Sequence, residues 1–201
     1  MLVGLNKTIE EQLKILEKIL LKNEKLMSIL KILNDYSSEN LKFKNYYVTA
    51  GAINQTVFNY YHNFDLNYGI KDFDIIYFDS DVSYEAEDKI IKELTNKLKK
   101  IDAFFDIKNE ARVHMWIYDK YGIKRDPYIS VEDAISSFGA TITCIGVRLK
   151  QNKLQIFCPY GLNDIFSMTI RPVKKKFTKK QYFERARRWK EKWPGLQIEE
   201  W

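Results

Sequence analysis

Residues 72–78 read Asp72-Phe73-Asp74-Ile75-Ile76-Tyr77-Phe78, a β-prone segment with two acids at alternate positions. Side chains alternate across a strand, so both carboxylates project from the same face. Two desolvated like charges are costly together unless a cation neutralises them. Magnesium fits best, because it is a hard ion that binds carboxylate oxygens and substrate phosphates. The alternative without a metal has Asp72 solvated at the strand start and Asp74 paired with a lysine.

A glycine turn precedes this strand and a third acid follows it. A strand predicted over 46–49 ends at Ala50-Gly51, where a helix predicted over 51–61 begins and offers unpaired amides to a phosphate. Packing between helix and strand explains this glycine equally well. Asp106 lies in a strand predicted over 103–107, and one crossover helix separates it from Asp74, so the two strands can be neighbours. Three carboxylates facing a phosphate-binding turn are what two-metal phosphoryl chemistry requires.

Periodicity and turn signals predict the remaining elements. They are one or two helices over 8–35 with a capping box at Thr8 and Glu11, a helix capped by Ser80 or Asp81 that runs to about residue 98, a short helix over 131–136, strands over 141–149 and 154–157, and a basic helix over 177–193. The fold class is therefore α+β (an α/β mixed sheet) in a single domain over 1–201. We expect a helical N-terminal extension over 1–45, a catalytic core over 46–110 and a C-terminal part of the same domain over 111–201.

The composition excludes several classes of protein. Hydrophobic residues make up 45% of the 201 residues, and the two cysteines, Cys144 and Cys158, make neither a disulfide framework nor a metal-ligand spacing. We interpret both as small buried thiols. No signal peptide or membrane-length apolar run is present, so we expect a cytoplasmic protein without a membrane partner. The net charge of +6 favours anionic partners such as nucleotides, RNA or DNA.

Ordered blocks of this sequence resemble the polymerase-β-like nucleotidyltransferase superfamily. More closely, the chain is similar to a bacterial nucleotidyltransferase family of unassigned substrate, once catalogued as a domain of unknown function. The likeness covers nearly the whole chain after residue 45. Its matching blocks are Ala50 to Val57, Asp72 to Asp79, Asp106 to Trp116, Ser130 to Ala134, Pro159 to Phe166, Arg171-Pro172 and Arg188 to Lys190.

The resemblance implies a core with N-terminal helices and a magnesium-dependent enzyme, manganese being the other candidate ion. Such an enzyme transfers a nucleoside monophosphate from a nucleoside triphosphate, for example ATP, to an acceptor hydroxyl on RNA, a protein or a small molecule, and releases pyrophosphate. Asp72, Asp74 and Asp106 would be the catalytic, metal-binding acids, and Gly51 would meet the triphosphate. A metal-dependent phosphohydrolase that uses the same acids is an alternative.

Ala52, Asn54, Gln55, Lys108 and Arg112 are the other candidate nucleotide-binding residues. Lys108 and Arg112 follow the third acid and could bind phosphate oxygens, with surface charge as the alternative. Ala52 stands where the superfamily usually has Gly or Ser, and Asn54 stands where some relatives have Arg. These departures motivate a further alternative, a non-catalytic nucleotide- or RNA-binding module with the same fold.

The basic helix predicted over 177–193 interleaves aromatic residues with arginines and lysines. It could line a path for a polyanionic acceptor through charge and stacking. Alternatively, its aromatic side chains pack inward and leave solvated lysines outside.

Overall fold

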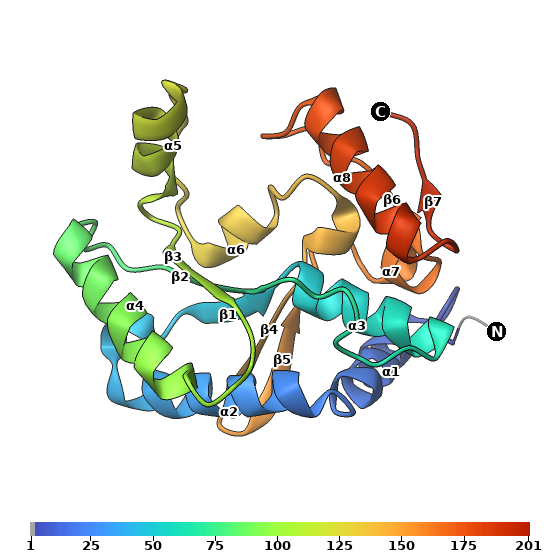
Figure 1. Cartoon of the computed structure of the whole chain (residues 1–201), viewed down its shortest axis with the longest axis horizontal. Coiled ribbons are helices and arrows are strands. Elements are labelled where there is room, and N and C mark those ends of the chain that lie inside the picture. Colours follow the sequence, from blue (N-terminus) through green and yellow to red (C-terminus); the bar gives the residue numbers. More distant parts are fainter. Residues whose placement is uncertain (1–2) are drawn as a thin grey trace.

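A five-stranded mixed sheet organises residues 3–201, the part of the chain that the computed structural model describes (Figure 1). The strand order is β3-β2-β1-β4-β5, in which β2 and β3 are parallel and the other pairs are antiparallel. The strands are β1 (Tyr46–Thr49), β2 (Phe73–Tyr77), β3 (Phe105–Asn109), β4 (Gly146–Lys150) and β5 (Lys153–Phe157), with a separate parallel pair of β6 (Thr169–Ile170) and β7 (Gln197–Ile198). The predicted mixed sheet is confirmed.

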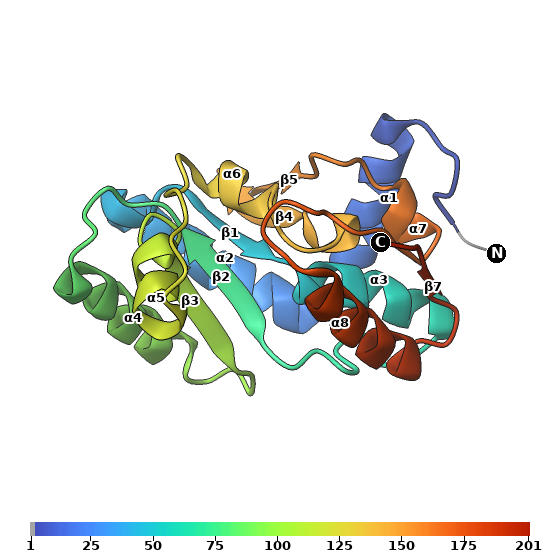
Figure 2. The same ribbon diagram turned by 90° about the horizontal axis from the view of Figure 1, so that it is seen from above.

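Helices cover both faces of this sheet (Figures 1 and 2). Helices α2 and α4 lie on one side, and α6 and α8 lie on the other, while α5 projects away from the sheet. The helices are α1 (Ile9–Leu20), α2 (Glu24–Glu39), α3 (Gly51–His62), α4 (Tyr84–Leu98), α5 (Val113–Tyr121), α6 (Val131–Ile135), α7 (Asn163–Phe166) and α8 (Lys179–Lys192), with two 3₁₀ turns at Leu41–Phe43 and Thr141–Thr143.

Strand alternation separates the main core from the face that carries polar groups. Phe73, Ile75 and Tyr77 of β2 are buried in the main core with the apolar residues of α2 and α4. Ile76 points to the opposite face, where it packs with Val131 and other residues around α6. The acid-bearing face of β2 is therefore covered only in part by α6, and this leaves room for a pocket.

Several boundaries differ from the sequence-based expectation. The one or two helices expected over 8–35 are two, because the Asn23 side chain accepts a hydrogen bond from the Leu26 amide and starts a second helix, which ends at Glu39 rather than at residue 35. Helix α4 is capped by Ser83 rather than by Ser80 or Asp81, and Asp81 instead accepts from the Ser83 amide and hydroxyl. The predicted capping box at Thr8 is confirmed.

The second half of the chain shows the larger differences. The strand predicted over 141–149 begins only at Gly146, because Thr141–Thr143 forms a 3₁₀ turn in which the Thr143 amide bonds to the Ala140 carbonyl. Strand β3 lies two residues later than predicted. Helices α5 and α7 and the β6–β7 pair were not predicted. No helix among the described residues is both long and apolar enough to span a bilayer.

Candidate active site

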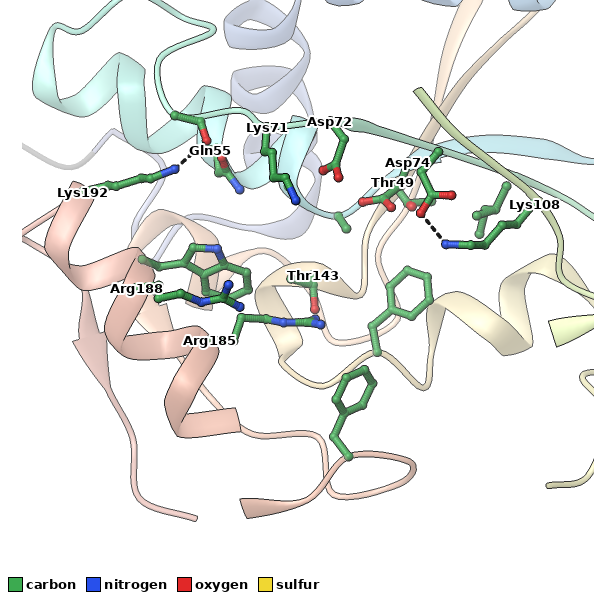
Figure 3. A pocket seen from close by; sticks show the side chains of 18 of the residues that line it. Thr49, Gln55, Lys71, Asp72, Asp74, Lys108, Thr143, Arg185, Arg188 and Lys192 are labelled. Atoms are coloured by element: carbon green, nitrogen blue, oxygen red, sulfur yellow. Dashed lines mark hydrogen bonds and ion pairs between the residues drawn. The ribbon is translucent and has the colours of Figure 1, made fainter. Parts of the chain in front are cut away.

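A pocket of about 500 Å³ opens on the α6–α8 side of the sheet (Figure 3). This size is within the usual range for small-molecule sites, about 300–1,000 Å³. Strands β2 and β3 supply an acidic wall, and helix α8 supplies a basic wall opposite to it. The start of α3 contributes Gly51 and Gln55 between the two walls.

The acidic wall is built on strand register. Asp74 of β2 lies opposite Asp106 of the parallel strand β3 and opposite Thr49 of the antiparallel strand β1. Neighbouring strands are about 4.8 Å apart, so these three side chains form one row across the sheet. Asp72, two residues before Asp74, also lines the pocket (Figure 3). The predicted pairing of the strands that carry Asp74 and Asp106 is confirmed.

Burial and crowding raise the pKa of Asp74 to about 7. Desolvation is the largest cause, and the negative charges of Asp72 and Asp106 add to it. Lys108, which also lines the pocket, makes an ion pair with Asp106. Lys108 therefore offsets only part of the negative charge of the acidic wall.

Glu110 is a fourth pocket carboxylate, which the sequence reasoning missed. It continues the alternation of Asp106 and Lys108 just beyond the end of β3, and its amide donates to the Tyr77 carbonyl at 2.8 Å. Only 5% of its surface is exposed, and burial raises its pKa to about 8. The spacing 106, 108, 110 was the available signal, because side chains at alternate positions share one face.

The donor set of this wall suits a hard divalent cation. Asp72, Asp74 and Asp106 offer carboxylate oxygens, the ligands that Mg²⁺ and Mn²⁺ accept. Lys108 already places one cationic group against Asp106. Among residues 3–201, however, no three His, Cys, Asp or Glu side chains are already gathered around a common metal position. Metal binding therefore requires these carboxylates to reorient.

The turn before α3 has an unusual backbone. Ala50 has φ 55° and ψ −121°, a region that favours glycine, and Gly51 follows as the first residue of α3. The first amides of a helix have no intrahelical acceptor, so they can bind an anion. Gln55 is 8% exposed, and its Oε1 has no hydrogen-bond partner among the described residues. A Cβ at Gly51 would lie 2.7 Å from Gln55 Nε2, so a side chain at position 51 would displace Gln55.

We expect Ala50→Gly to stabilise the protein. Glycine removes a backbone strain of about 1–3 kcal/mol. It also lowers stability by about 0.4–1 kcal/mol, because it gives the unfolded chain more conformational freedom, so the net gain in the free energy of unfolding is about 1 kcal/mol. Urea unfolding measures the change. Ala52→Gly is the matched control, because Ala52 is buried within α3 and should lose stability. A lower stability for Ala50→Gly would contradict the strain.

Three of the candidate nucleotide-binding residues do not line this pocket. Ala52 is completely buried in the core. Asn54 is 1% exposed, and its amide donates to the Ile142 carbonyl at 2.9 Å, so it fixes the 3₁₀ turn to α3. Arg112 makes an ion pair with Glu87 of α4 and donates to the Val82 carbonyl at 2.8 Å. Gly51, Gln55 and Lys108 do line it.

We expect Arg112→Ala to lower stability and to leave nucleotide affinity unchanged. The Arg112 and Glu87 side chains are 18% and 16% exposed, so removing one partner leaves a poorly solvated charge and costs about 1–3 kcal/mol. Thermal unfolding and nucleotide titration of the same samples would separate the two effects. A weaker nucleotide affinity at unchanged stability would instead show that Arg112 contacts the nucleotide.

The basic wall belongs to the helix for which the sequence suggested either a path for a polyanionic acceptor or aromatic side chains packed inward with solvated lysines outside. Arg185, Arg188 and Lys192 of α8 line the pocket, as does Lys71, which precedes the acidic strand (Figure 3). The spacings of three and four between the α8 residues place them on one helix face. That spacing was visible in the sequence, but the element facing α8 was not.

Comparisons with known proteins identify a family and a similar fold. A family model described as Nucleotidyltransferase matches residues 37–198. The fold is similar to that of a protein whose NMR structure is described as revealing a CCA-adding enzyme head domain. That match has a TM-score of 0.71 and 25% sequence identity, and it covers 92% of this chain and 96% of the other. No curated protein matches the chain.

Proposed function

The chain belongs to the nucleotidyltransferase family, and from this we propose that it transfers a nucleoside monophosphate from a nucleoside triphosphate to an acceptor hydroxyl. Pyrophosphate is the second product. The observation that carries the proposal is the row of Asp74 and Asp106 in paired strands, with Asp72 beside it, facing the Gly51 turn across one pocket. Phosphoryl transfer depends mainly on positioning and charge stabilisation, and this arrangement supplies both.

Asp72, Asp74 and Asp106 would hold Mg²⁺ or Mn²⁺, which when bound neutralises phosphate charge and activates a hydroxyl. The Gly51 turn would bind phosphate oxygens through its amides. The hydroxyl oxygen of the acceptor attacks the α-phosphorus, and the bond from that phosphorus to the bridging oxygen breaks. Pyrophosphate leaves with the electron pair, and the hydroxyl proton passes to an acidic-wall carboxylate.

Incubation with labelled ATP, GTP, CTP or UTP in a cell extract containing Mg²⁺ tests this function. We expect label from one or more nucleotides to enter an acceptor fraction, with release of pyrophosphate. RNA is included as an acceptor because the similar structure is described as a CCA-adding enzyme head domain. Free nucleoside monophosphate without a labelled acceptor would favour hydrolysis. Binding without turnover would favour a non-catalytic module.

A further inference from the structure

Helix α8 is held firmly beside the pocket by contacts distant in sequence. The Tyr182 hydroxyl hydrogen-bonds to the carbonyls of Ile170 and Glu199, at 2.7 and 2.8 Å. At the other end of the helix, Trp193 Nε1 donates to Asn59 Oδ1 of α3 at 2.7 Å. Helix α8 is therefore tied to the β6–β7 pair and to α3. These contacts fix the backbone positions from which its inner-face side chains extend.

Two arginines of this inner face have their cationic groups unpaired. Among residues 3–201, neither Arg185 nor Arg188 has a carboxylate within 4.0 Å or a hydrogen bond from its guanidinium. The Arg185 guanidinium lies over the Phe177 ring, 5.1 Å from its centroid. Figure 3 shows both side chains reaching from α8 toward the acidic wall.

The surroundings of Arg185 favour the binding of an anion beside its guanidinium. Burial lowers its pKa, the neighbouring Arg188 lowers it further, and only Asp74, across the pocket, raises it. Two guanidinium groups held near each other are stabilised by a ligand that places negative oxygens between them. Asp74 does not serve that purpose, because it lies beyond ion-pair distance from either arginine.

The position of these arginines selects the kind of anion. They face into a pocket of about 500 Å³, a volume typical of small-molecule sites. A triphosphate has enough oxygens to face a metal-bearing wall and a cationic wall together. Arginine binds such oxygens through a fixed pair of donors.

We propose that Arg185 and Arg188 bind the phosphates of the nucleoside triphosphate, so that α8 forms the second wall of the triphosphate site. This inference rests on the proposed function for the identity of the ligand. The triphosphate lies between α8 and the acidic wall, with Lys71 beside it. Residues close to the C-terminus thereby complete a site whose acids come from the middle of the chain.

Inorganic tripolyphosphate, titrated calorimetrically into the protein in EDTA, tests this site without metal or turnover. We expect Arg188→Ala and Arg185→Gln each to raise the Kd by roughly tenfold or more, as for the loss of a charge-assisted contact. Arg187→Ala is the matched control, because this arginine lies over Phe183, outside the pocket, and should change the Kd less than about twofold. Arg188 is exposed, so its variant should fold even if the Arg185 variant does not.

Asp74→Asn separates this inference from the proposed function. It should bind tripolyphosphate at least as tightly as the wild type, because it removes a negative charge. Unchanged Kd values in the arginine variants, or no binding by the wild type, would overturn the α8 site and leave the nucleotidyltransferase proposal standing. Weaker anion binding in those variants, together with no nucleotide transfer by the wild type, would support the α8 site and contradict the proposed function. Loss of single-stranded RNA binding alone would place α8 in the acceptor site and overturn the inference.

Discussion

Asp74→Asn should reduce nucleotide transfer by about a hundredfold to a thousandfold, a loss typical of removing one group that stabilises transition-state charge. Asparagine keeps the shape of the side chain but removes the charge at the centre of the Thr49–Asp74–Asp106 row. The carboxylate is needed to hold a divalent cation against the triphosphate, and a neutral amide is a poor ligand for that ion. Pyrophosphate release from a nucleoside triphosphate with Mg²⁺ measures the loss.

The same substitution should leave the fold intact. The Asp74 carboxylate is destabilised by burial and by its acidic neighbours, so Asn should not weaken the metal-free protein at neutral pH. Asp88→Asn is the matched control, because Asp88 pairs with Lys92 on the surface of α4. That variant should keep the wild-type rate. An Asp74→Asn protein that retains a tenth of the rate would show that this carboxylate is not used in the reaction.

The acidic wall was predictable because strand alternation is a local property. Asp72 and Asp74 had to share a face, and one crossover helix between Asp74 and Asp106 made their strands neighbours. Glu110 follows the same rule, but it comes after β3 ends, where the apolar pattern stops. Local reasoning therefore identified Asp72, Asp74 and Asp106 and missed the fourth acid, Glu110.

The basic wall depends on packing that local reasoning does not reach. Trp193 bonds to Asn59 across 134 residues, and this contact, together with the Tyr182 hydrogen bonds to Ile170 and Glu199, holds α8 where Arg185 and Arg188 face the acids. The backbone conformation of Ala50 could not be predicted from the sequence either, because alanine rarely adopts a positive φ.

Helix α5 is rich in aromatic residues and has no side-chain N-cap. Gly122, at φ 66° just after the helix, was its main sequence signal.

In the absence of divalent metal, we expect the protein to be less stable at about pH 8 than at about pH 5. In the folded state Asp74 keeps its proton to about pH 7 and Glu110 to about pH 8, whereas the ordinary pKa values of such carboxyl groups are 3.8 and 4.5. Between those values the folded state binds more protons than the unfolded chain, so stability falls as pH rises. Asp81 has the opposite shift, because a hydrogen bond from Lys42 holds its pKa well below the usual range. The stability from Asp81 is complete above about pH 4, so it does not offset the fall.

The fall should be about 3 kcal/mol, less than the sum of the two shifts, because Asp74 and Glu110 also repel each other. For a chain of this length it corresponds to a drop of about 10 °C in Tm, measured by thermal unfolding in EDTA. The double variant Asp74→Asn with Glu110→Gln should flatten the profile, since neither amide titrates. Adding Mg²⁺ at about pH 8 should restore Tm in the wild type but not in the double variant, because bound metal favours the ionised carboxylates. A metal-free Tm that rises between pH 5 and pH 8 would mean that these two carboxyl groups are not held in a desolvated, mutually repelling arrangement.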